Sequence, residues 1–314
     1  MGFGGVSAGA GPAAAGSDGE KDVRAVGVDR PAGLLSVVGT PIGNLEDASP
    51  RVRRVLGEAD VVLCEDTRVT GKLMSAFGLH VRLERCDENV MDARVPAVLE
   101  RLAAGERVAF VSDAGMPGVS DPGQRLVDAA LDAGLRVEVV PGPSAVTCAL
   151  VASGLASEHF FFEGFLPRKR GAQLARLEEL AVVPGTLVAY ESPRRVAETL
   201  ANVASVMSGR QVALVRELTK VHEEVVRGEA AELAARVAAR EEVRGECVIV
   251  IAAPSPDELD SRRRAASGTA ELTLKEAIAA GLSAGEPKSA LAKRLAREYG
   301  ISRSEAYDAV VAAS

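Results

Sequence analysis

From Leu34 onward, short apolar runs alternate along the chain with longer stretches in which apolar residues recur at helical spacing. The apolar runs predict strands, and the stretches between them predict helices near 92–104 and 122–133. The predicted strands are 34–38, 61–64, 108–111 and 137–140. This alternation is typical of an α/β domain with a largely parallel sheet, and we expect that domain at residues 34–150.

A second α/β unit, residues 151–253, follows a predicted helix through the segment SAVTCALVASG. Its strand candidates are again short and apolar, and its helix candidates have the longer periodic pattern. The strands are expected at 159–165, 186–191, 211–217 and 246–252, and the helices near 170–181, 194–206 and 229–240.

The two ends of the chain differ from these domains. Residues 1–33 are rich in glycine, alanine and serine and lack both periodicity and the pattern of a secretory signal, so we expect a disordered tail. Residues 254–271 are polar, with two prolines and a triple arginine, and are expected to form a linker. Residues 272–314 return to helical periodicity, and two helices joined across residues 300–302 resemble a helix-turn-helix.

Composition narrows the functional classes. The hydrophobic fraction of 47% is typical of a folded soluble protein, and no apolar run is long enough to span a bilayer. The four cysteines and three histidines are scattered without metal-ligand spacing, so we expect no metal site and a cytoplasmic location. The formal net charge of −7 argues against a generic nucleic-acid coat protein, although a local basic patch is compatible with it. Basic residues cluster at 167–170, 193–195 and 262–264.

Loops rich in glycine, proline and polar residues follow the predicted strands of the first domain, where parallel sheets bind ligands. They read GTPIGNLED (39–47), EDTR (65–68), SDAGMPG (112–118) and PGPSA (141–145). The first loop fits neither G-x-G-x-x-G nor G-x-x-x-x-G-K-[ST], so a plain strand-to-helix turn stays open as its interpretation. Glu65 and Asp66 lie where a dinucleotide fold places its ribose-binding acid, which by itself leaves an oxidoreductase open.

Three polar residues in these loops have either a capping or a binding role. Asp113 lies too far upstream to cap the helix that follows, so we favour a ligand contact for it. Asp121 stands directly before Pro122, where capping is the better interpretation. Ser144 lies near a helix start, where a cap and a ligand contact are compatible.

The segment YESPRR places Glu191, Arg194 and Arg195 after a predicted strand of the second domain. Two arginines on the first turn of a helix are unfavourable to the helix dipole. The residues alone leave two interpretations open, which are a nearby anion and an ion pair with Glu191.

Seven segments in order resemble the tetrapyrrole-methylase superfamily of class III S-adenosylmethionine (SAM) methyltransferases, and within it the branch that methylates small-subunit ribosomal RNA (rRNA). They are VGTPIGNLEDASPR, CEDTRVTGKL, VSDAGMPGVSDPG, VPGPSA, FEGFLPRK, YESPRR and RELTKVHEE. The resemblance covers about Leu34 to Ala253 and extends to the helical tail. The tetrapyrrole enzymes usually have G-D-P at residues 112–114 and lack the FLPRK and YESPRR segments, so a porphyrinoid methyltransferase is the second hypothesis.

The resemblance implies a class III SAM methyltransferase with two α/β domains, a SAM cleft between them, a small C-terminal helical domain and a homodimeric state. The implied reaction transfers a methyl group from SAM, without a metal, to the 2′-hydroxyl of a cytidine in small-subunit rRNA or the assembled small subunit. Carried over residue by residue, the family pattern assigns SAM binding to Pro41, Ser112, Asp113, Ala114, Gly115, Val119, Ser120, Pro143 and Ser144 and, from the second domain, to Leu166 and Thr219.

The implied chemistry also needs a base and a surface for RNA. The candidates for accepting the hydroxyl proton are Glu65, Asp66, Glu191 and Lys220. A lysine acts as a base when desolvation lowers its pKa. The side chains better suited to phosphates are Arg68, Arg168, Lys169, Arg170, Arg194 and Arg195.

A third hypothesis, from another functional class, is a DNA-binding regulator that uses the terminal helix-turn-helix with the α/β body as a ligand sensor. Its recognition helix would include Arg303. The nearly balanced charge of residues 272–314 and their few base-reading side chains argue against it.

Overall fold

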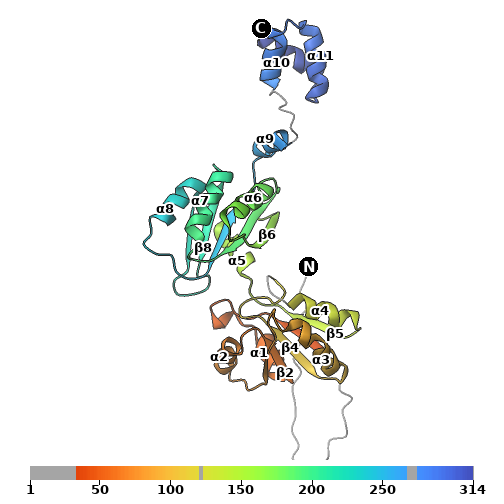
Figure 1. Cartoon of the computed structure of the whole chain (residues 1–314), viewed down its shortest axis with the longest axis vertical. Coiled ribbons are helices and arrows are strands. Elements are labelled where there is room, and N and C mark those ends of the chain that lie inside the picture. The colour runs from red at the N-terminus through yellow and green to blue at the C-terminus, as the bar shows by residue number, and fades with distance from the viewer. Residues whose placement is uncertain (1–32, 120–122, 267–273, 314) are drawn as a thin grey trace, which may run out of the picture.

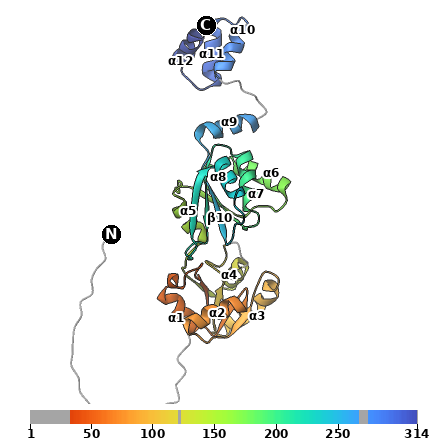
Figure 2. The ribbon, with the colours of Figure 1, turned by 90° about the vertical axis from the view of Figure 1, so that its left-hand side faces the viewer.

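The structure is a computed structural model that describes residues 33–119, 123–266 and 274–313 of the 314-residue chain. Two α/β domains follow one another along the long axis of the molecule, and a small helical domain lies at the far end (Figure 1, Figure 2). The α/β class predicted from the sequence is confirmed in both domains. Residues 1–32, which make up nearly all of the expected tail, lie outside the described residues.

The first domain is built on a five-stranded parallel sheet of order β3-β2-β4-β1-β5. Its strands are β1 (Leu34–Val38), β2 (Val61–Cys64), β3 (Leu83–Arg85), β4 (Arg107–Val111) and β5 (Arg136–Val140). Its helices are α1 (Pro50–Glu58), α2 (Thr67–Phe77), α3 (Met91–Ala103) and α4 (Gly123–Asp132), with a 3-10 turn at Leu45–Asp47. The four strands predicted from the apolar runs are confirmed. Strand β3 has no counterpart in the prediction because its three residues form no apolar run.

Helices cover both faces of this first sheet, which is why its strands are apolar on both sides. On one face Leu35 and Phe110 pack against residues of α3 and α4. On the other face Val38 and Val62 pack against residues of α1 and α2. Because both faces are covered, the loops at the carboxyl ends of the strands are left as the accessible edge.

The second domain has a mixed five-stranded sheet of order β6-β7-β10-β8-β9, in which β6 and β7 are parallel and the other pairs antiparallel. Its strands are β6 (Phe160–Phe165), β7 (Thr186–Glu191), β8 (Gln211–Arg216), β9 (Glu224–Glu229) and β10 (Cys247–Ile251). Its helices are α5 (Ala145–Ser153), α6 (Arg170–Leu180), α7 (Val196–Val206) and α8 (Ala230–Ala238). Strand β9 has no counterpart in the prediction because Val226 is its one buried residue.

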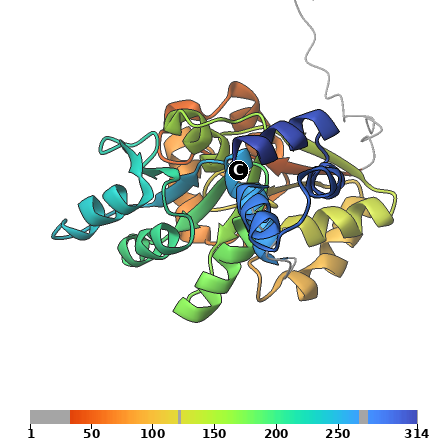
Figure 3. The same ribbon diagram turned by 90° about the horizontal axis from the view of Figure 1, so that it is seen from above.

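The helices of the second domain divide between the two faces of its sheet. Helices α6, α7 and α8 lie on one side, where they fan out in green to cyan in the view from above (Figure 3). Helix α5 packs on the other face against Val188 and Val248, together with Ile42 from the first domain. The expected boundary between residues 150 and 151 therefore falls inside a helix that joins the two domains.

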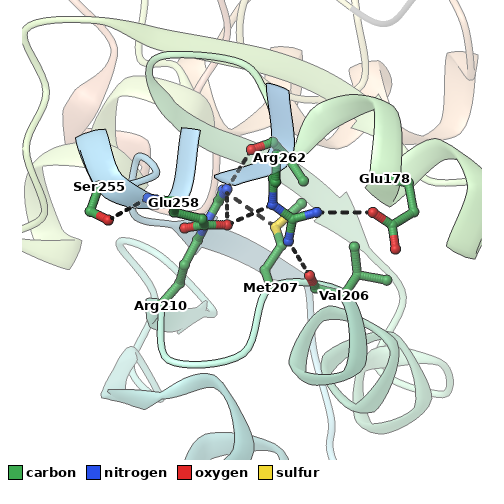
Figure 4. A network of polar contacts seen from close by, with 8 residues as sticks. Glu178, Val206, Met207, Arg210, Ser255, Glu258 and Arg262 are labelled. Atoms are coloured by element: carbon green, nitrogen blue, oxygen red, sulfur yellow. Dashed lines mark hydrogen bonds and ion pairs between the residues drawn. The ribbon is translucent and has the colours of Figure 1, made fainter. Parts of the chain in front are cut away.

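Part of the expected linker is a helix, α9 (Pro256–Ala266), so the prediction of a linker throughout 254–271 is wrong for these residues. The helix starts with Pro256 in its first turn, while the Ser255 hydroxyl accepts a hydrogen bond from the Glu258 backbone N–H at 3.1 Å. Its Glu258 and Arg262 are held by residues of the second domain, as Figure 4 shows. Arg210, whose side chain is 3% exposed, lies 2.8 Å from Glu258, and Glu258 also accepts from Arg262 at 2.9 Å.

The C-terminal helices are α10 (Leu274–Ser283), α11 (Lys288–Glu298) and α12 (Arg303–Ala312). They enclose a hydrophobic cluster of their own, which includes Leu291, Leu295 and Val310. Helix α12 begins with a capping box between Ser302 and Glu305, which fixes the turn between α11 and α12. The predicted pair of helices across residues 300–302 is confirmed. In the part of the chain that the structure describes, no helix combines the length and apolarity needed to cross a membrane.

Candidate active site

A cavity of about 510 Å³ lies between the two sheets, within the range typical of small-molecule sites. Its first-domain side consists of loops that follow β1, β2, β4 and β5, represented by Ile42, Glu65, Ser112 and Ser144. Its second-domain side consists of the ends of β6, β7 and β10. The carboxyl edge of the parallel sheet therefore faces the second domain, and loops that the sequence analysis singled out line the cavity there.

Backbone contacts join three of the loops that the sequence singled out. Thr40 and Gly115 form an isolated antiparallel bridge, in which the N–H of Thr40 donates to the carbonyl of Gly115 at 2.9 Å. The backbone N–H of Gly142 donates to the sulfur of Met116 at 3.2 Å. A Cβ added to Gly39 would lie 2.6 Å from the nitrogen of Gly142, so these backbones touch and only glycine fits. The loops after β1, β4 and β5 therefore form one preorganised surface.

Three acids lie together where β2 and β4 end. The Asp113 carboxylate accepts a hydrogen bond from the backbone N–H of Asp66 at 3.1 Å, and the Asp113 N–H donates to Glu65 Oε1 at 3.3 Å. Burial raises the pKa of Asp113, and the neighbouring charge of Asp66 adds to that rise. Glu65 and Asp113 line the cavity.

Asp66 has a different position from its two neighbours. It caps α2 by accepting a hydrogen bond from the backbone N–H of Arg68 at 2.8 Å, and its carboxylate lies 2.6 Å from the Arg68 guanidinium. The hydrogen bond from Arg68 holds the pKa of Asp66 well below its ordinary value. Its carboxylate is not part of the cavity lining.

Glu191 lines the cavity, but its carboxylate is fully buried and committed to other groups. It accepts hydrogen bonds from the Ser192 backbone N–H at 2.7 Å, from the Thr199 hydroxyl at 2.7 Å and from Arg195 at 3.0 Å. Of the two interpretations of YESPRR, the structure therefore contains the ion pair with Glu191. Helix α7 begins at Val196, so the predicted placement of both arginines on its first turn is wrong.

Lys220 lies in an ion-pair cluster between β8 and β9. Its ammonium lies 2.7 Å from Glu217 and 3.1 Å from Glu246. Partial burial opposes its charge, but the hydrogen bonds that the ammonium donates to these two carboxylates outweigh burial and raise the pKa of Lys220. A lysine that acts as a base needs a lowered pKa, whereas these contacts favour the charged ammonium.

Thr219 beside it has two unusual features. Its φ of 63° lies in the left-handed region, and its hydroxyl oxygen is buried without a hydrogen-bond partner among the described residues. It packs against the first loop, because a Cβ on Gly43 would lie 2.8 Å from that oxygen. A buried unpaired hydroxyl is available to a bound polar group.

The structure places about half of the predicted SAM-binding residues in the cavity wall. Those in the wall are Ser112, Asp113, Ala114, Gly115, Val119 and Ser144. Ser144 is also the N-cap residue of α5, but its side chain makes no capping bond. Those outside the wall are Pro41, Pro143, Leu166 and Thr219, and Leu166 is buried in the core of the second domain. Ser120 lies outside the described residues.

The candidate RNA-binding residues divide into free and paired groups. Arg168, Lys169 and Arg194 are exposed and form no ion pair with any side chain that the structure describes. Arg170 donates weakly to Asn202 at 3.4 Å. Arg195 pairs with Glu191, and Arg68, although exposed, pairs with Asp66. The free cations follow β6 and β7, which are neighbouring parallel strands, so they lie at the same edge of the second sheet.

The sequence analysis missed the aromatic side of the cavity. Phe165 and Tyr190 line it, and their ring centroids are 5.6 Å apart in an edge-to-face arrangement. The sequence did contain a signal for these residues, because aromatic side chains are scarce in this chain. The whole chain has seven phenylalanines, three tyrosines and no tryptophan. Four of the phenylalanines lie within residues 160–165.

The residues of 33–119, 123–266 and 274–313 contain no cluster of three or more histidine, cysteine, aspartate or glutamate side chains placed to hold a metal ion. The described part of the site therefore consists of carboxylates, small polar loops and aromatic rings.

Comparisons with known proteins agree with this arrangement. The model of the Tetrapyrrole (Corrin/Porphyrin) Methylases family matches residues 34–234. A Mesorhizobium japonicum protein named "Ribosomal RNA small subunit methyltransferase I" is 44% identical over 266 residues, which cover 83% of this chain and 90% of that protein. A Mycobacterium bovis protein of the same name is 44% identical over 283 residues, covering 89% of this chain and 95% of that protein. The crystal structure of the methyltransferase CobJ matches in fold, with a TM-score of 0.54 at 21% identity over 70% of this chain and 94% of that chain.

Proposed function

This chain belongs to the tetrapyrrole (corrin/porphyrin) methylase family, and on that premise we propose that it transfers the methyl group of SAM to the 2′-hydroxyl of a cytidine in small-subunit rRNA. The rRNA substrate is supported by the names of the relatives at 44% identity, which align with most of this chain. It is supported independently by the free basic residues beside the cavity.

The charge of the cavity is the observation that carries the proposal for SAM. The charged side chains among its described lining residues are all carboxylates, namely Glu65, Asp113, Glu191 and Glu246. Two of them form ion pairs, Glu191 with Arg195 and Glu246 with Lys220, so Glu65 and Asp113 carry the argument. SAM carries a positive sulfonium and a positive amino group, which carboxylates attract, whereas NAD and ATP carry phosphates, which they repel.

The loops that would hold SAM are the ones joined by the Thr40–Gly115 bridge and the Gly39–Gly142 contact. When bound, SAM supplies a methyl carbon that is electrophilic because it is attached to a positive sulfur. The loops would hold that carbon in line with the ribose oxygen, and such positioning is a major part of catalysis in a reaction of this kind. The Thr219 hydroxyl lies against Gly43 of the first loop but outside the cavity lining, so its contact with SAM stays a prediction.

Transfer forms a bond between the 2′-oxygen and the methyl carbon, breaks the carbon–sulfur bond, and releases the hydroxyl proton to a base. We assign the base to Glu65, which lines the cavity beside Asp113. Asp66 and Lys220 do not line the cavity, and the carboxylate of Glu191 is fully buried.

The RNA would approach from the edge of the second sheet where Arg168, Lys169 and Arg194 lie. Their charges are exposed and unpaired among the described residues, which is the state expected of phosphate-binding side chains in the absence of RNA. This small basic rim reconciles an RNA substrate with a net charge of −7.

Transfer of a labelled methyl group from SAM tests the proposal with three acceptors in parallel: assembled small subunits, naked small-subunit rRNA and a porphyrinogen. We expect label on a cytidine ribose in the RNA, located by nuclease digestion and mass spectrometry. Label on the porphyrinogen alone would support the second hypothesis instead. In a parallel melting experiment, SAM at a hundred times its Kd should stabilise the protein by about 2.7 kcal/mol, and NAD and ATP should not.

We extend the proposal to a cytoplasmic homodimer, the state that the resemblance implies. Val139 on β5 and Val151 on α5 are large apolar residues left exposed in the single chain, 54% and 77% respectively. A second copy covering them would remove this apolar area from water. Sedimentation analysis of the full chain would show one species of twice the monomer mass, whereas a monomer at working concentrations would contradict the proposal.

A further inference from the structure

A β-bulge in β6 turns Phe165 toward the cavity. In a regular strand, residues three apart such as Phe162 and Phe165 point to opposite faces of the sheet. Here the register with β7 shifts between Phe162 and Gly164, and Gly164 has a left-handed φ of 75°. The extra residue puts both phenylalanines on the face of the sheet that carries Tyr190. Bulges that re-aim one side chain are common beside functional sites.

The ring of Phe165 is supported on one side and open on the other. Tyr190 lies edge-to-face with Phe165 at 5.6 Å and with Phe162 at 5.0 Å, so the three rings form a row. Phe162 belongs to the core at one end of the row, but Phe165 at the other end is 61% exposed while it lines the cavity. Core packing does not account for an aromatic ring held by its neighbour and left open to the cavity.

The surroundings of this ring favour a nucleotide. Phe165 is followed at once by the loop that carries Arg168 and Lys169, and Arg194 follows the neighbouring strand β7. The two loops are tied together, because the Arg195 guanidinium donates to the carbonyl of Leu166 at 3.1 Å. An aromatic face next to free cations is the arrangement that single-stranded RNA-binding sites use, with the ring stacking on a base and the cations holding phosphates.

We infer that Phe165 stacks on the base of the nucleotide whose ribose is methylated, while that ribose enters the cavity and the adjoining phosphates lie on Arg168, Lys169 and Arg194. The inference rests on the proposed function. Enzymes that do chemistry on a base draw that nucleotide out of its stacked position and stack the base on protein rings, and we infer the same arrangement for a ribose that must enter the cavity. Stacking is tolerant of base identity, so Phe165 positions the nucleotide and leaves the choice of cytidine to polar groups.

The competing occupant of the ring is the adenine of SAM, which is also a flat base. The two occupants differ in what the loss of the ring would weaken. Removing a base-stacking residue weakens RNA binding at unchanged SAM affinity, whereas removing an adenine-stacking residue weakens SAM binding in the absence of RNA.

The test uses the full chain with Phe165→Ala and Phe165→Trp, and Phe160→Ala as the matched control. Phe160 is an exposed phenylalanine, 45% exposed, at the opposite end of the same strand. The measurements are SAM affinity without RNA, KM and kcat for the small-subunit RNA, and the fluorescence of pyrrolocytidine placed at the target position, which falls when that base stacks.

We expect Phe165→Ala to raise KM for RNA about tenfold to a hundredfold, the loss typical of one stacked base, with SAM affinity unchanged. Phe165→Trp should restore both KM and the fluorescence decrease, and Phe160→Ala should behave as the unchanged chain. Weakened SAM binding in Phe165→Ala, or unchanged KM and fluorescence, would overturn the inference. Failure of the unchanged chain to methylate any RNA would instead overturn the proposed function, so the two failures are distinguishable.

Discussion

The carboxylate of Asp113 accepts a hydrogen bond from the backbone N–H of Asp66 at 3.1 Å, and this contact joins the loop after β4 to the loop after β2. Asp113 also lines the cavity, so one side chain both fixes the geometry of two loops and presents a negative charge to a ligand. These two roles separate under substitution, because asparagine keeps a hydrogen-bond acceptor and removes the charge.

Asp113→Asn should weaken SAM binding about tenfold or more, because a hydrogen bond or contact to a charged group contributes roughly 1.5–3 kcal/mol. Its melting temperature should stay close to that of the unchanged chain, whereas Asp113→Ala should lose both affinity and stability. Calorimetric titration with SAM and a thermal melt measure the two effects. The control is Asp60→Asn, since Asp60 accepts from the Arg107 backbone N–H at 2.8 Å at the opposite edge of the sheet. Equal SAM affinity in Asp113→Asn and Asp60→Asn would contradict a ligand role for Asp113.

Glu65→Gln should lower single-turnover methylation about a hundredfold to ten-thousandfold at saturating SAM and RNA, the usual loss for a general base. Lys220→Met should keep most of the turnover, because the ammonium is held charged by Glu217 and Glu246 and takes no part in the chemistry. Rapid-quench assays of both variants measure the single-turnover rate of methylation and distinguish Glu65 from Lys220 as the base. A large loss of turnover in Lys220→Met alone, with Glu65→Gln unaffected, would reverse the assignment of the base.

Arg194 and Arg195 are neighbours in sequence with different expected roles. Arg194→Gln should weaken RNA binding and reduce the log–log salt slope by about 0.7 for one lost phosphate contact on a single strand, with stability unchanged. Arg195→Gln should instead lower stability by about 3 kcal/mol, because it leaves the fully buried carboxylate of Glu191 without its basic partner. RNA binding across a salt series and chemical denaturation separate the two variants. Identical behaviour of both would show that the division into surface and structural arginines is mistaken.

Glu224 gives the second domain part of its stability at neutral pH. Hydrogen bonds from Arg240, reinforced by Arg216, lower the pKa of Glu224 to about 2. Because this pKa is below that of the unfolded chain, the stabilisation is complete above about pH 4.5 and is lost as the pH falls toward 2. Glu224→Gln should therefore flatten the fall in stability over this acid range and lower stability at pH 7. Denaturation midpoints at several pH values measure this, with Glu232→Gln on the exposed side of α8 as the control. If stability falls equally steeply toward acid pH in Glu224→Gln and in the unchanged chain, this prediction is refuted.

Glu258→Ala should detach α9 from the second domain, because it leaves Arg210 buried without its carboxylate partner. The expected cost of about 3 kcal/mol corresponds to a roughly hundredfold rise in the population with α9 released. Faster tryptic cleavage at arginines 262–264, followed by mass spectrometry, reports this release. Asp257→Ala changes the adjacent, exposed acid of the same helix and should leave the cleavage rate as it is.

Local patterns determine a large part of this protein. The central strands β1, β2 and β4 of the first sheet are buried by helices on both faces, so each is a largely apolar run that can be recognised without knowledge of its neighbours. The ligand-facing loops are also visible in the sequence, because close approach of backbones, as at Gly39 and Gly142, leaves only glycine possible. Strand β3 and helix α9 escaped this reasoning because their residues are polar, and their structure depends on a pairing strand and on buried charged partners.

The roles of the charged and aromatic residues depend on the tertiary structure. The sequence by itself determined that acids follow β2, that an acid ends β7, and that basic residues follow β6 and β7. Only the tertiary structure decided that Glu65 faces the cavity while Asp66 caps a helix, and that Arg195 is paired while Arg194 is exposed. The physical reason is that a charge takes its role from the partner within a few ångströms. The path of the backbone decides which of several neighbouring charges meets a partner and which one faces the cavity.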